Sequence, residues 1–194
     1  MKYTYFCPII FSLGVKNVLT SICEAPNNDT KNWKYFQSTY ENGQEYGVYY
    51  YLSTQKADAF SAAEFCTSTF KNNPVDLAKS LSQSENNFLY VNYMQNINAA
   101  WLSGGYVAGN LQLNATNISG EWFWFDSLRT PFLFDYTNWE VGQPKISDFG
   151  SENFYSPKNW LSIRGSNNPG RWASEPSYKT NYFLCEKRCG TPIQ

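Results

Sequence analysis

The sequence predicts one globular domain in which two amphipathic helices are followed by a longer half made of strands and aromatic-rich loops. The chain has 194 residues, of which 42% are hydrophobic and 19% aromatic, and this suits one domain with a full core and a short leader. Apolar residues recur at helical spacing after Asp58 and after Ser82. From Ala99 onward, strand-like segments and frequent Gly, Pro and Asn replace that spacing.

The first 25 residues are expected to form a secretory signal peptide. Lys2 supplies a positive start, and a mostly apolar run follows from Tyr3 to Val15. Lys16 and Asn17 end this run before the roughly 20 residues that a membrane span needs. Small residues leave three alternative cleavage sites open, after positions 14, 23 and 25. The rest of the chain divides into a lead-in (26–47), the main domain (48–189) and a tail (190–194).

Three glycosylation sequons agree with export, and they begin at Asn28, Asn114 and Asn117. The last two lie close together in a polar segment, which predicts an exposed, glycosylated loop. We therefore expect an extracellular, secreted protein.

Charge and composition exclude several functions. The net charge is -1 and no basic run occurs, so the sequence lacks the positive surface that nucleic-acid binding requires. The chain contains no histidine, which excludes Ser-His-Asp and Cys-His catalysis and removes the commonest zinc ligand. No spacing of carboxylates indicates an acid/base pair. We expect a protein that is not an enzyme and that uses no cofactor.

The two helices have recognisable starts. Asp58 is expected to cap the first helix, whose apolar face carries Ala59, Ala62, Ala63, Cys66 and Phe70. Ser82 and Glu85 have the spacing of a capping box for the second helix, which continues through Leu89, Tyr93 and Ile97. Pro74 separates the two helices.

Four short strands are expected around these helices, at Val48–Leu52, Ala99–Leu102, Trp122–Asp126 and Tyr182–Glu186. In the third strand, the two Trp residues alternate with the two Phe residues and so face opposite sides of the sheet. Trp101, Trp122 and Trp124 are expected to be structural. The segment between the last two strands is loop-rich, and loops often carry binding residues.

Several short motifs occur in a fixed order between Tyr49 and Lys187. They are AAEFC at 62–66, DLA at 76–78, SQSE at 82–85, WLSG at 101–104, WFWFD at 122–126, NW at 138–139, GQP at 142–144, RW at 171–172 and FLCE at 183–186. This series resembles the C-type lectin-like domain, especially its secreted arthropod members. The resemblance implies an α+β fold with two helices, antiparallel sheets, a long ligand-binding loop region and neighbouring chain ends.

The resemblance also implies a disulfide between Cys66 and Cys185. A cysteine on the core face of a helix and another in the last strand of an exported chain are good partners. Closing so long a loop would stabilise the fold by about 4 to 5 kcal/mol. Cys23 and Cys189 form a possible second pair, but cleavage after Cys23 would leave Cys189 unpaired and able to link two chains. Cys7 lies in the leader.

The calcium site of the family is altered in this sequence. In calcium-dependent members, the main triplet is Glu-Pro-Asn or Gln-Pro-Asp, followed by a Glu and by an Asn-Asp pair after a Trp. Gln143 and Glu152 match that pattern, whereas Lys145, Ala173 and Ser174 do not. Because calcium prefers six to eight oxygen ligands, we expect no metal at this position.

Two further family features are missing from their expected positions. Ile146 and Asn153 stand where an accessory calcium is often held, and Phe154 and Ser177 stand where the second family disulfide would form. The loop region must then be held by packing. Aromatic side chains that could supply it are Trp139, Phe149, Phe154, Tyr155, Trp160 and Trp172.

We hypothesise that the Lys145 ammonium takes the place of calcium and pairs with Glu152, while Gln143 contributes its carbonyl oxygen. The alternative is that Lys145 simply points into water. An exposed pair of this kind would add about 0 to 1 kcal/mol, so its role would concern loop geometry more than stability.

These residues predict a secreted module that binds its ligand without calcium through the loop region 136–172. The altered site comprises Gln143, Pro144, Lys145, Glu152, Asn153, Trp172, Ala173 and Ser174. A protein or other surface ligand would use the aromatic residues together with Arg164 and Arg171. The alternative ligand is a carbohydrate, bound by aromatic stacking and by hydrogen bonds from Gln143, Asn153 and Asn159.

Overall fold

The structure is a computed structural model that describes residues 24–26, 31–39, 45–70, 75–107, 111–113, 116–118, 121–125, 132–145 and 159–189. Residues 1–23 of the predicted leader, Asn28, Asn114, Glu152 and Asn153 fall outside these residues, as does the side chain of Asn117. None of the helices in the described part of the chain is long and apolar enough to cross a membrane.

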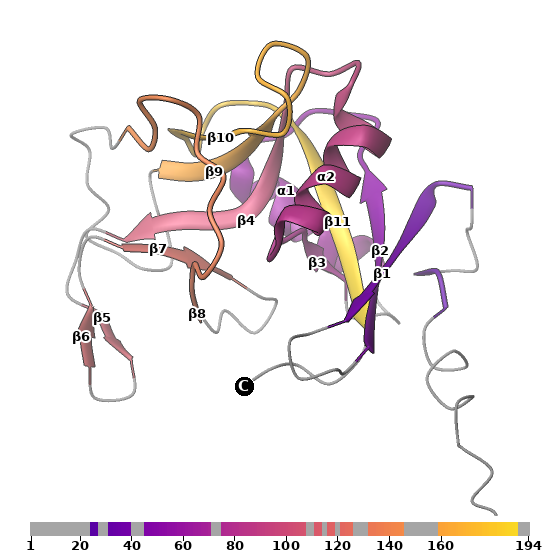
Figure 1. Ribbon diagram of the computed structural model, residues 1–194, viewed down its shortest axis with the longest axis horizontal. Coiled ribbons are helices and arrows are strands. Elements are labelled where there is room, and N and C mark those ends of the chain that lie inside the picture. Colours follow the sequence, from indigo (N-terminus) through magenta and orange to yellow (C-terminus); the bar gives the residue numbers. More distant parts are fainter. Residues whose placement is uncertain are drawn as a thin grey trace, which may run out of the picture.

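The described elements combine two α-helices with many short strands (Figure 1). In chain order they are β1 (Trp33–Thr39), β2 (Glu45–Leu52), α1 (Ala59–Thr69), β3 (Asp76–Leu77), α2 (Gln83–Leu89), the π-helical segment η2 (Tyr90–Met94), β4 (Ala99–Val107), β5 (Leu111–Leu113), β6 (Thr116–Ile118), β7 (Glu121–Trp124), β8 (Phe132–Leu133), β9 (Asn159–Arg164), β10 (Trp172–Pro176) and β11 (Tyr182–Cys189). All four predicted strand segments contribute residues to β2, β4, β7 and β11.

The main sheet is mixed, whereas the sequence analysis expected antiparallel sheets. Its strands follow the order β1-β2-β11-β4-β7-β8, and β9 joins β4 and carries β10. The pair β11 and β4 is parallel, with Tyr182 opposite Ala100. This is possible because a long stretch of chain separates the two strands, as parallel neighbours require.

The first helix begins where the sequence predicts. The Asp58 carboxylate accepts hydrogen bonds from the backbone N–H groups of Phe60, at 3.0 Å, and Ser61, at 2.9 Å. These bonds, chiefly that from Ser61, lower the pKa of Asp58. Cys66 is fully buried and forms a disulfide with Cys185, with 5.6 Å between the Cα atoms. This confirms the disulfide that the resemblance implies and ties α1 to β11.

The second cysteine pair is only partly within the described residues. Cys189, at the end of β11, is disulfide-bonded, and Cys23 lies outside the described part of the chain. The two described chain ends lie close together: the Lys187 ammonium donates a hydrogen bond to the Glu24 carbonyl at 2.8 Å.

The second helix has the expected cap but a different continuation. The Ser82 hydroxyl accepts a hydrogen bond from the Glu85 N–H at 3.2 Å. The Glu85 carboxylate accepts from the N–H of Leu81 at 2.6 Å, one residue before the position expected in a capping box. The α-helix ends at Leu89, and a π-helical segment continues it to Met94, so the predicted α-helical spacing to Ile97 is wrong beyond Leu89.

The predicted lead-in over residues 26–47 contains strand β1, which the sequence analysis did not predict. β1 pairs antiparallel with β2, with Trp33 opposite Tyr51. Trp33 is buried, and its ring lies 5.1 Å from that of Phe70. Trp33 therefore packs against the end of α1, a contact that local sequence does not reveal.

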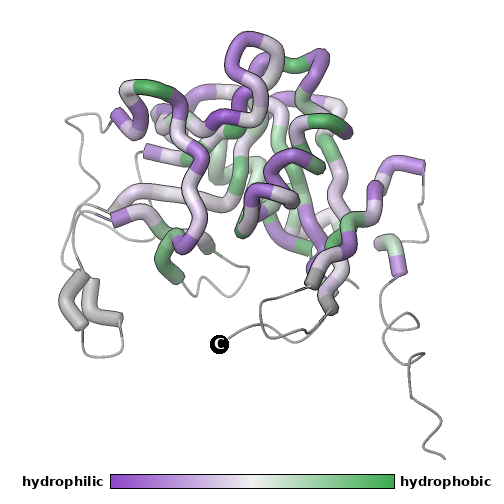
Figure 2. The backbone as a smooth tube through the Cα atoms, in the orientation of Figure 1, coloured by the Kyte–Doolittle hydropathy of each residue, from purple (hydrophilic) through white to green (hydrophobic). Residues whose placement is uncertain are grey.

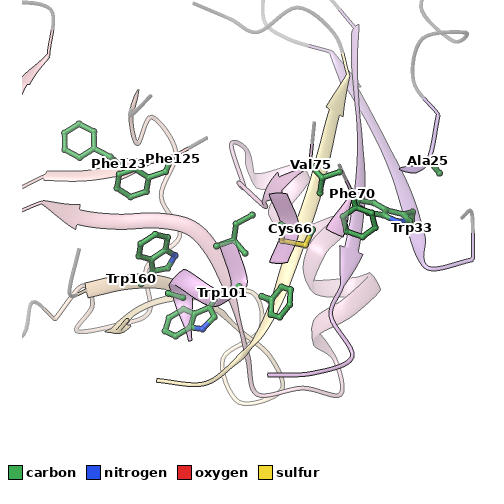
Figure 3. Close-up of a cluster of buried hydrophobic side chains, with 14 residues drawn as sticks. Ala25, Trp33, Cys66, Phe70, Val75, Trp101, Phe123, Phe125 and Trp160 are labelled. Carbon is green, nitrogen blue, oxygen red and sulfur yellow. A yellow bond between two sulfur atoms is a disulfide. The ribbon is translucent and has the colours of Figure 1, made fainter. Parts of the chain in front are cut away.

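The hydrophobic core consists of two clusters on opposite sides of β7. Phe123 and Phe125 belong to the cluster that also contains Cys66 and Cys185 (Figure 3). Trp122 and Trp124 belong to the other cluster, together with Trp172. The predicted alternation along this strand is therefore confirmed, and both Trp side chains are buried in the core.

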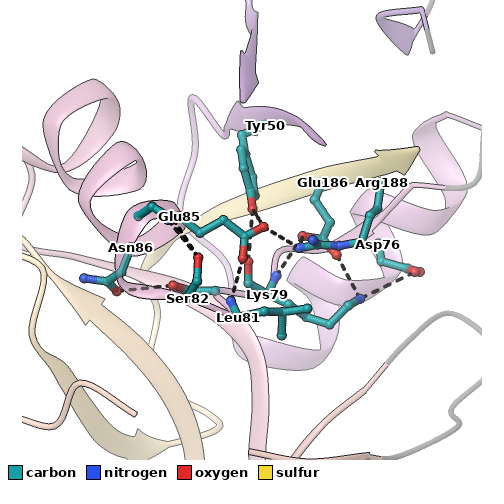
Figure 4. A network of polar contacts seen from close by, with 11 residues as sticks. Tyr50, Asp76, Lys79, Leu81, Ser82, Glu85, Asn86, Glu186 and Arg188 are labelled. Atoms are coloured by element: carbon teal, nitrogen blue, oxygen red, sulfur yellow. Dashed lines mark hydrogen bonds and ion pairs between the residues drawn. The ribbon is translucent and has the colours of Figure 1, made fainter. Parts of the chain in front are cut away.

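A network of buried charges joins α2 to β11 (Figure 4). Glu85 accepts hydrogen bonds from Tyr50 and from the Arg188 guanidinium, both at 2.8 Å. Glu186 pairs with Arg188 at 3.1 Å and with Lys79 at 2.9 Å. Burial alone would raise the pKa of Glu186, but the two cations lower it below its ordinary value. The charges are thus mutually neutralised, as burial requires.

Candidate functional site

The segment that carries Gln143 is fastened to β10 by backbone hydrogen bonds. Trp139 and Trp172 form a parallel β-bridge. The Trp172 N–H donates to the Asn138 carbonyl, and the Glu140 N–H donates to the Trp172 carbonyl, both at 2.8 Å. This bridge places Gln143, Pro144 and Lys145 beside Ala173 and Ser174, so the two described halves of the predicted site come together.

The side-chain carbonyl of Gln143 is the centre of this arrangement. Its oxygen accepts hydrogen bonds from the backbone N–H groups of Lys145, at 2.9 Å, and Ser174, at 3.1 Å. The Ser174 hydroxyl lies 3.3 Å from the same oxygen and donates to the Lys145 carbonyl. Because a carbonyl oxygen has two lone pairs, the two N–H donors occupy its accepting capacity.

The remaining predicted site residues differ in exposure. Trp172 and Ala173 are fully buried, and Ser174 is nearly so. Lys145 is exposed, and Gln143 and Pro144 are half-buried. The hypothesised partner of Lys145, Glu152, lies outside the described residues, so the pairing stays a prediction.

Asn86 is an anchor of the loop region that the sequence analysis missed. Its side-chain N–H₂ donates to the Gly170 carbonyl at 2.9 Å, and its oxygen accepts from the indole N–H of Trp172 at 2.7 Å. Asn138 donates to the same Gly170 carbonyl at 2.9 Å. Asn86 lies in α2, 86 residues before Trp172, and no local signal points to a contact of that range.

Arg164 and Arg171, which the sequence analysis assigned to a ligand-binding surface, have different surroundings. Arg164 is an ion-pair residue, since its guanidinium contacts both Glu140 and Glu175. Burial alone would raise the pKa of Glu175, but bonds from Lys179 and Asn181 and the charge of Arg164 lower it. Arg171 is exposed and donates to the Asn138 side chain at 2.8 Å. Arg164 is therefore engaged with two carboxylates, whereas Arg171 is more exposed.

The buried aromatic residues of the loop region pack into the core, whereas Trp139 is only half-buried. Trp160 and Trp172 belong to the two core clusters, and Trp139 packs against Trp172 with 5.9 Å between ring centroids. Asn159, proposed as a sugar contact, is also buried, which argues against direct contact with a ligand. Phe149, Phe154 and Tyr155 lie outside the described residues.

A pocket that the sequence analysis did not predict lies where β7 and β8 meet the start of the loop region. Its volume is about 170 Å³, and we call it the β7–β8 pocket; its lining residues are Glu121, Trp122, Leu133, Phe134, Thr137 and Trp139. The side chains of Phe132 and Leu133 in β8 are exposed beside the pocket. Figure 2 shows β8 as a hydrophobic segment. Two stretches of chain, 121–122 and 133–139, build the pocket, so no single motif could reveal it.

Over the described ranges, no three His, Cys, Asp or Glu side chains gather in a group that would hold a metal ion. The Gln143 side-chain oxygen faces two backbone N–H groups and the Ser174 hydroxyl.

Solved structures of several proteins resemble this fold over most of the chain. The mouse scavenger receptor C-type lectin carbohydrate-recognition domain is 20% identical, with a TM-score of 0.55, and the match covers 82% of this chain and 98% of that one. Human lithostathine is 17% identical, with a TM-score of 0.53 and coverage of 90% and 97%. Herring type II antifreeze protein is 16% identical, with a TM-score of 0.53 and coverage of 85% and 99%.

Comparison of the sequence alone finds no match. No family model matches the chain, and no curated protein sequence matches it. The structural matches, together with two helices, a mixed sheet and neighbouring chain ends, define the class: this protein has the C-type lectin-like fold. One fold can carry different functions. Whether this protein binds a metal ion, and which ligand it binds, must therefore be argued from its own residues.

Proposed function

We propose that this protein is a secreted, non-enzymatic binding module that recognises a protein or other surface ligand without calcium, through the loop region 136–172. The observation that carries the proposal is the hydrogen bonding of Gln143. Its side-chain oxygen accepts hydrogen bonds from the backbone N–H groups of Lys145 and Ser174, so a cation at that oxygen would have to displace these bonds.

The surrounding residues do not fit calcium either. Calcium requires several oxygen ligands, usually with more than one carboxylate among them. Lys145 and Ala173 supply no side-chain oxygen, and the Ser174 hydroxyl is engaged with the Lys145 carbonyl. Hydrogen bonds within the protein therefore hold the Gln143 segment against β10. In a calcium-binding site, the cation would have this role.

The exposed side chains near Gln143 favour a protein ligand. The turn from Glu140 to Gln143 is closed by a hydrogen bond of 2.9 Å and has Gly142 at φ 79°. This geometry leaves the Val141 side chain fully exposed, an unusual position for an apolar group. Lys145 and Arg171 are also exposed. An apolar tip with flanking cations suits an anionic or mixed protein surface.

A carbohydrate ligand is the second candidate, and the β7–β8 pocket is the observation that favours it. Aromatic rings of Trp122 and Trp139 adjoin the polar side chains of Glu121 and Thr137 there. Stacking on aromatic rings and direct hydrogen bonds need no metal, so the altered calcium site does not oppose this candidate.

A glycan array probed once with calcium and once with a chelator tests the proposal. A calcium-dependent lectin on the same array is the positive control for chelation. We expect the two conditions to give the same result for this protein. Absence of glycan binding supports a protein ligand, and chelator-insensitive glycan binding supports the second candidate. Binding that the chelator abolishes would contradict the calcium-independent function.

A further inference from the structure

The β7–β8 pocket contains two aromatic rings that are partly open to solvent. Phe134 and Trp139 are half-buried, and their rings are nearly parallel, with an interplanar angle of 24° and 6.2 Å between the centroids. Trp122 is buried beside them, with its ring centroid 5.0 Å from that of Trp139. Because the rings pack against one another, a ligand contacts chiefly the open parts of Phe134 and Trp139.

Glu121 supplies the only formal charge among the residues that line the pocket. It is the first residue of β7, and it is exposed. Its carboxylate makes no hydrogen bond or ion pair with any residue in the described part of the chain. Asp135, which follows Phe134 in the chain, is also exposed and adds a second negative charge to this part of the molecule.

The apolar side chains of β8 are exposed beside the pocket. The exposed fractions of Phe132 and Leu133 are 39% and 44%, and among the described strands β8 pairs only with β7. Exposed apolar groups with a polar rim are typical of surfaces that bind other proteins. A partner that reaches the pocket can therefore bury apolar surface on β8 at the same time.

The charge of the pocket distinguishes between classes of ligand group. An anion would be repelled by Glu121. A neutral group would make ordinary hydrogen bonds, which are roughly half as strong as those to a charged partner. A cation would be attracted by the carboxylate and also by the negative faces of the aromatic rings. The lining residues therefore favour a cation over a neutral group.

A guanidinium fits these residues better than an ammonium. It is planar and stacks on aromatic rings, and its fork of N–H groups matches the two oxygens of a carboxylate. An ammonium is a strongly hydrated point charge without a flat face. The exposed Thr137 hydroxyl can accept one further N–H bond. The volume of about 170 Å³ is below the roughly 300 to 1,000 Å³ of drug-sized sites, so the pocket accommodates one side-chain head group.

We propose that the β7–β8 pocket binds an arginine side chain of a protein partner. The guanidinium lies against Phe134 and Trp139 and pairs with Glu121, while an apolar residue next to the arginine covers β8. The proposal rests on the protein-binding function proposed above and gives that function one defined contact. A carbohydrate in the same pocket is the competing outcome of the test.

Nuclear magnetic resonance titrations of isotope-labelled protein test the charge preference. The probe is N-acetyl-arginine amide, and the matched control is N-acetyl-citrulline amide, which has nearly the same shape but no charge. We expect the arginine probe to shift the indole N–H signal of Trp139 and the backbone N–H signal of Glu121. The citrulline probe should bind at least about tenfold more weakly, and N-acetyl-lysine amide should also bind more weakly.

A pair of variants tests the role of the carboxylate. Glu121→Gln should weaken binding of the arginine probe roughly tenfold, because a charged acceptor becomes neutral, and should remove the preference over citrulline. Glu64→Gln, an exposed carboxylate on α1, is the matched control and should leave the affinity unchanged. Equal affinities of the two variants for the arginine probe would overturn the pairing with Glu121.

Two blocked tripeptides test whether the arginine comes from a protein. Acetyl-leucyl-arginyl-leucine amide should bind more tightly than acetyl-glycyl-arginyl-glycine amide, because a leucine covers the exposed side chains of β8. Leu133→Ser should reduce this difference. Equal affinities of the two tripeptides for the natural protein would overturn the assignment to a protein partner.

The remaining outcomes separate this proposal from the function on which it rests. The pocket assignment is rejected if the arginine probe at up to about 100 mM leaves both signals unshifted. It is also rejected if citrulline or neutral methyl pyranosides bind as tightly as arginine. Each titration is run in calcium and in chelator. Arginine binding that requires calcium would contradict the calcium-independent function, whereas absence of binding in both conditions rejects the pocket alone.

Discussion

The junction of α2 with β11 and the segment around Gln143 are both held by polar contacts, but of different kinds. At the junction, Glu85 and Glu186 are almost completely buried and form ion pairs with Arg188 and Lys79. A disulfide links the neighbouring α1 to β11. At the segment, one half-buried amide oxygen accepts two backbone donors. Buried ion pairs therefore stabilise the scaffold, whereas hydrogen bonds between uncharged groups near the solvent hold the candidate site together.

The largest effect is expected at the disulfide. Replacing Cys66 and Cys185 together by Ala should lower the free energy of unfolding by about 4 to 5 kcal/mol, because the unfolded chain gains conformational freedom. Urea denaturation of the variant and of the natural protein measures this. A loss below about 1 kcal/mol would mean that the scaffold does not need this link.

The next effect is expected at the buried charges. Arg188→Met should cost about 3 to 5 kcal/mol, because Glu85 and Glu186 would keep buried negative charges without their shared partner. Arg171→Met is the matched control, since Arg171 is exposed and makes one side-chain hydrogen bond, and it should cost less than about 1 kcal/mol. Equal costs for the two variants, measured by urea denaturation, would contradict the contrast between the regions.

A smaller effect is expected at the candidate site. Gln143→Ala removes the acceptor of two backbone N–H groups and should cost about 1 to 3 kcal/mol. Gln143→Glu keeps an acceptor oxygen and should restore most of this. Gln95→Ala, at an exposed position after η2, is the control and should change stability by less than about 0.5 kcal/mol. An unchanged unfolding midpoint for Gln143→Ala would remove the role assigned to this amide.

The smallest effect concerns the hypothesised ion pair. A double-mutant cycle with Lys145→Met and Glu152→Gln should give a favourable coupling free energy of no more than about 1 kcal/mol, as for exposed pairs. The control cycle combines Lys145→Met with Glu64→Gln and should give none. Equal couplings in the two cycles would show that Lys145 points into water.

What the sequence predicted correctly depended on local patterns or on an ordered series of motifs. Asp58 caps α1 because its carboxylate reaches backbone groups only two and three residues away. The alternation along β7 follows from strand geometry alone. The fold followed from the series of motifs, which spans most of the chain.

What the sequence did not predict depends on partners far away in the chain. Glu85 has the spacing of a helix cap, but Arg188, 103 residues later, gives it a second role. Arg164 was assigned to a ligand surface because its ion-pair partners cannot be known before the chain is folded. The bond from Ser174 to Gln143 spans 31 residues. Such contacts arise from tertiary packing and leave no short-range signal.

Titration calorimetry with calcium tests the central claim most directly. The account predicts no binding heat up to millimolar calcium for the natural protein, because Gln143 is engaged and Lys145 adds a positive charge. A variant with Lys145→Asp, Ala173→Asn and Ser174→Asp, which restores oxygen ligands, is the positive control. Calcium binding by the natural protein at millimolar or tighter affinity, abolished by Glu152→Gln, would contradict the account.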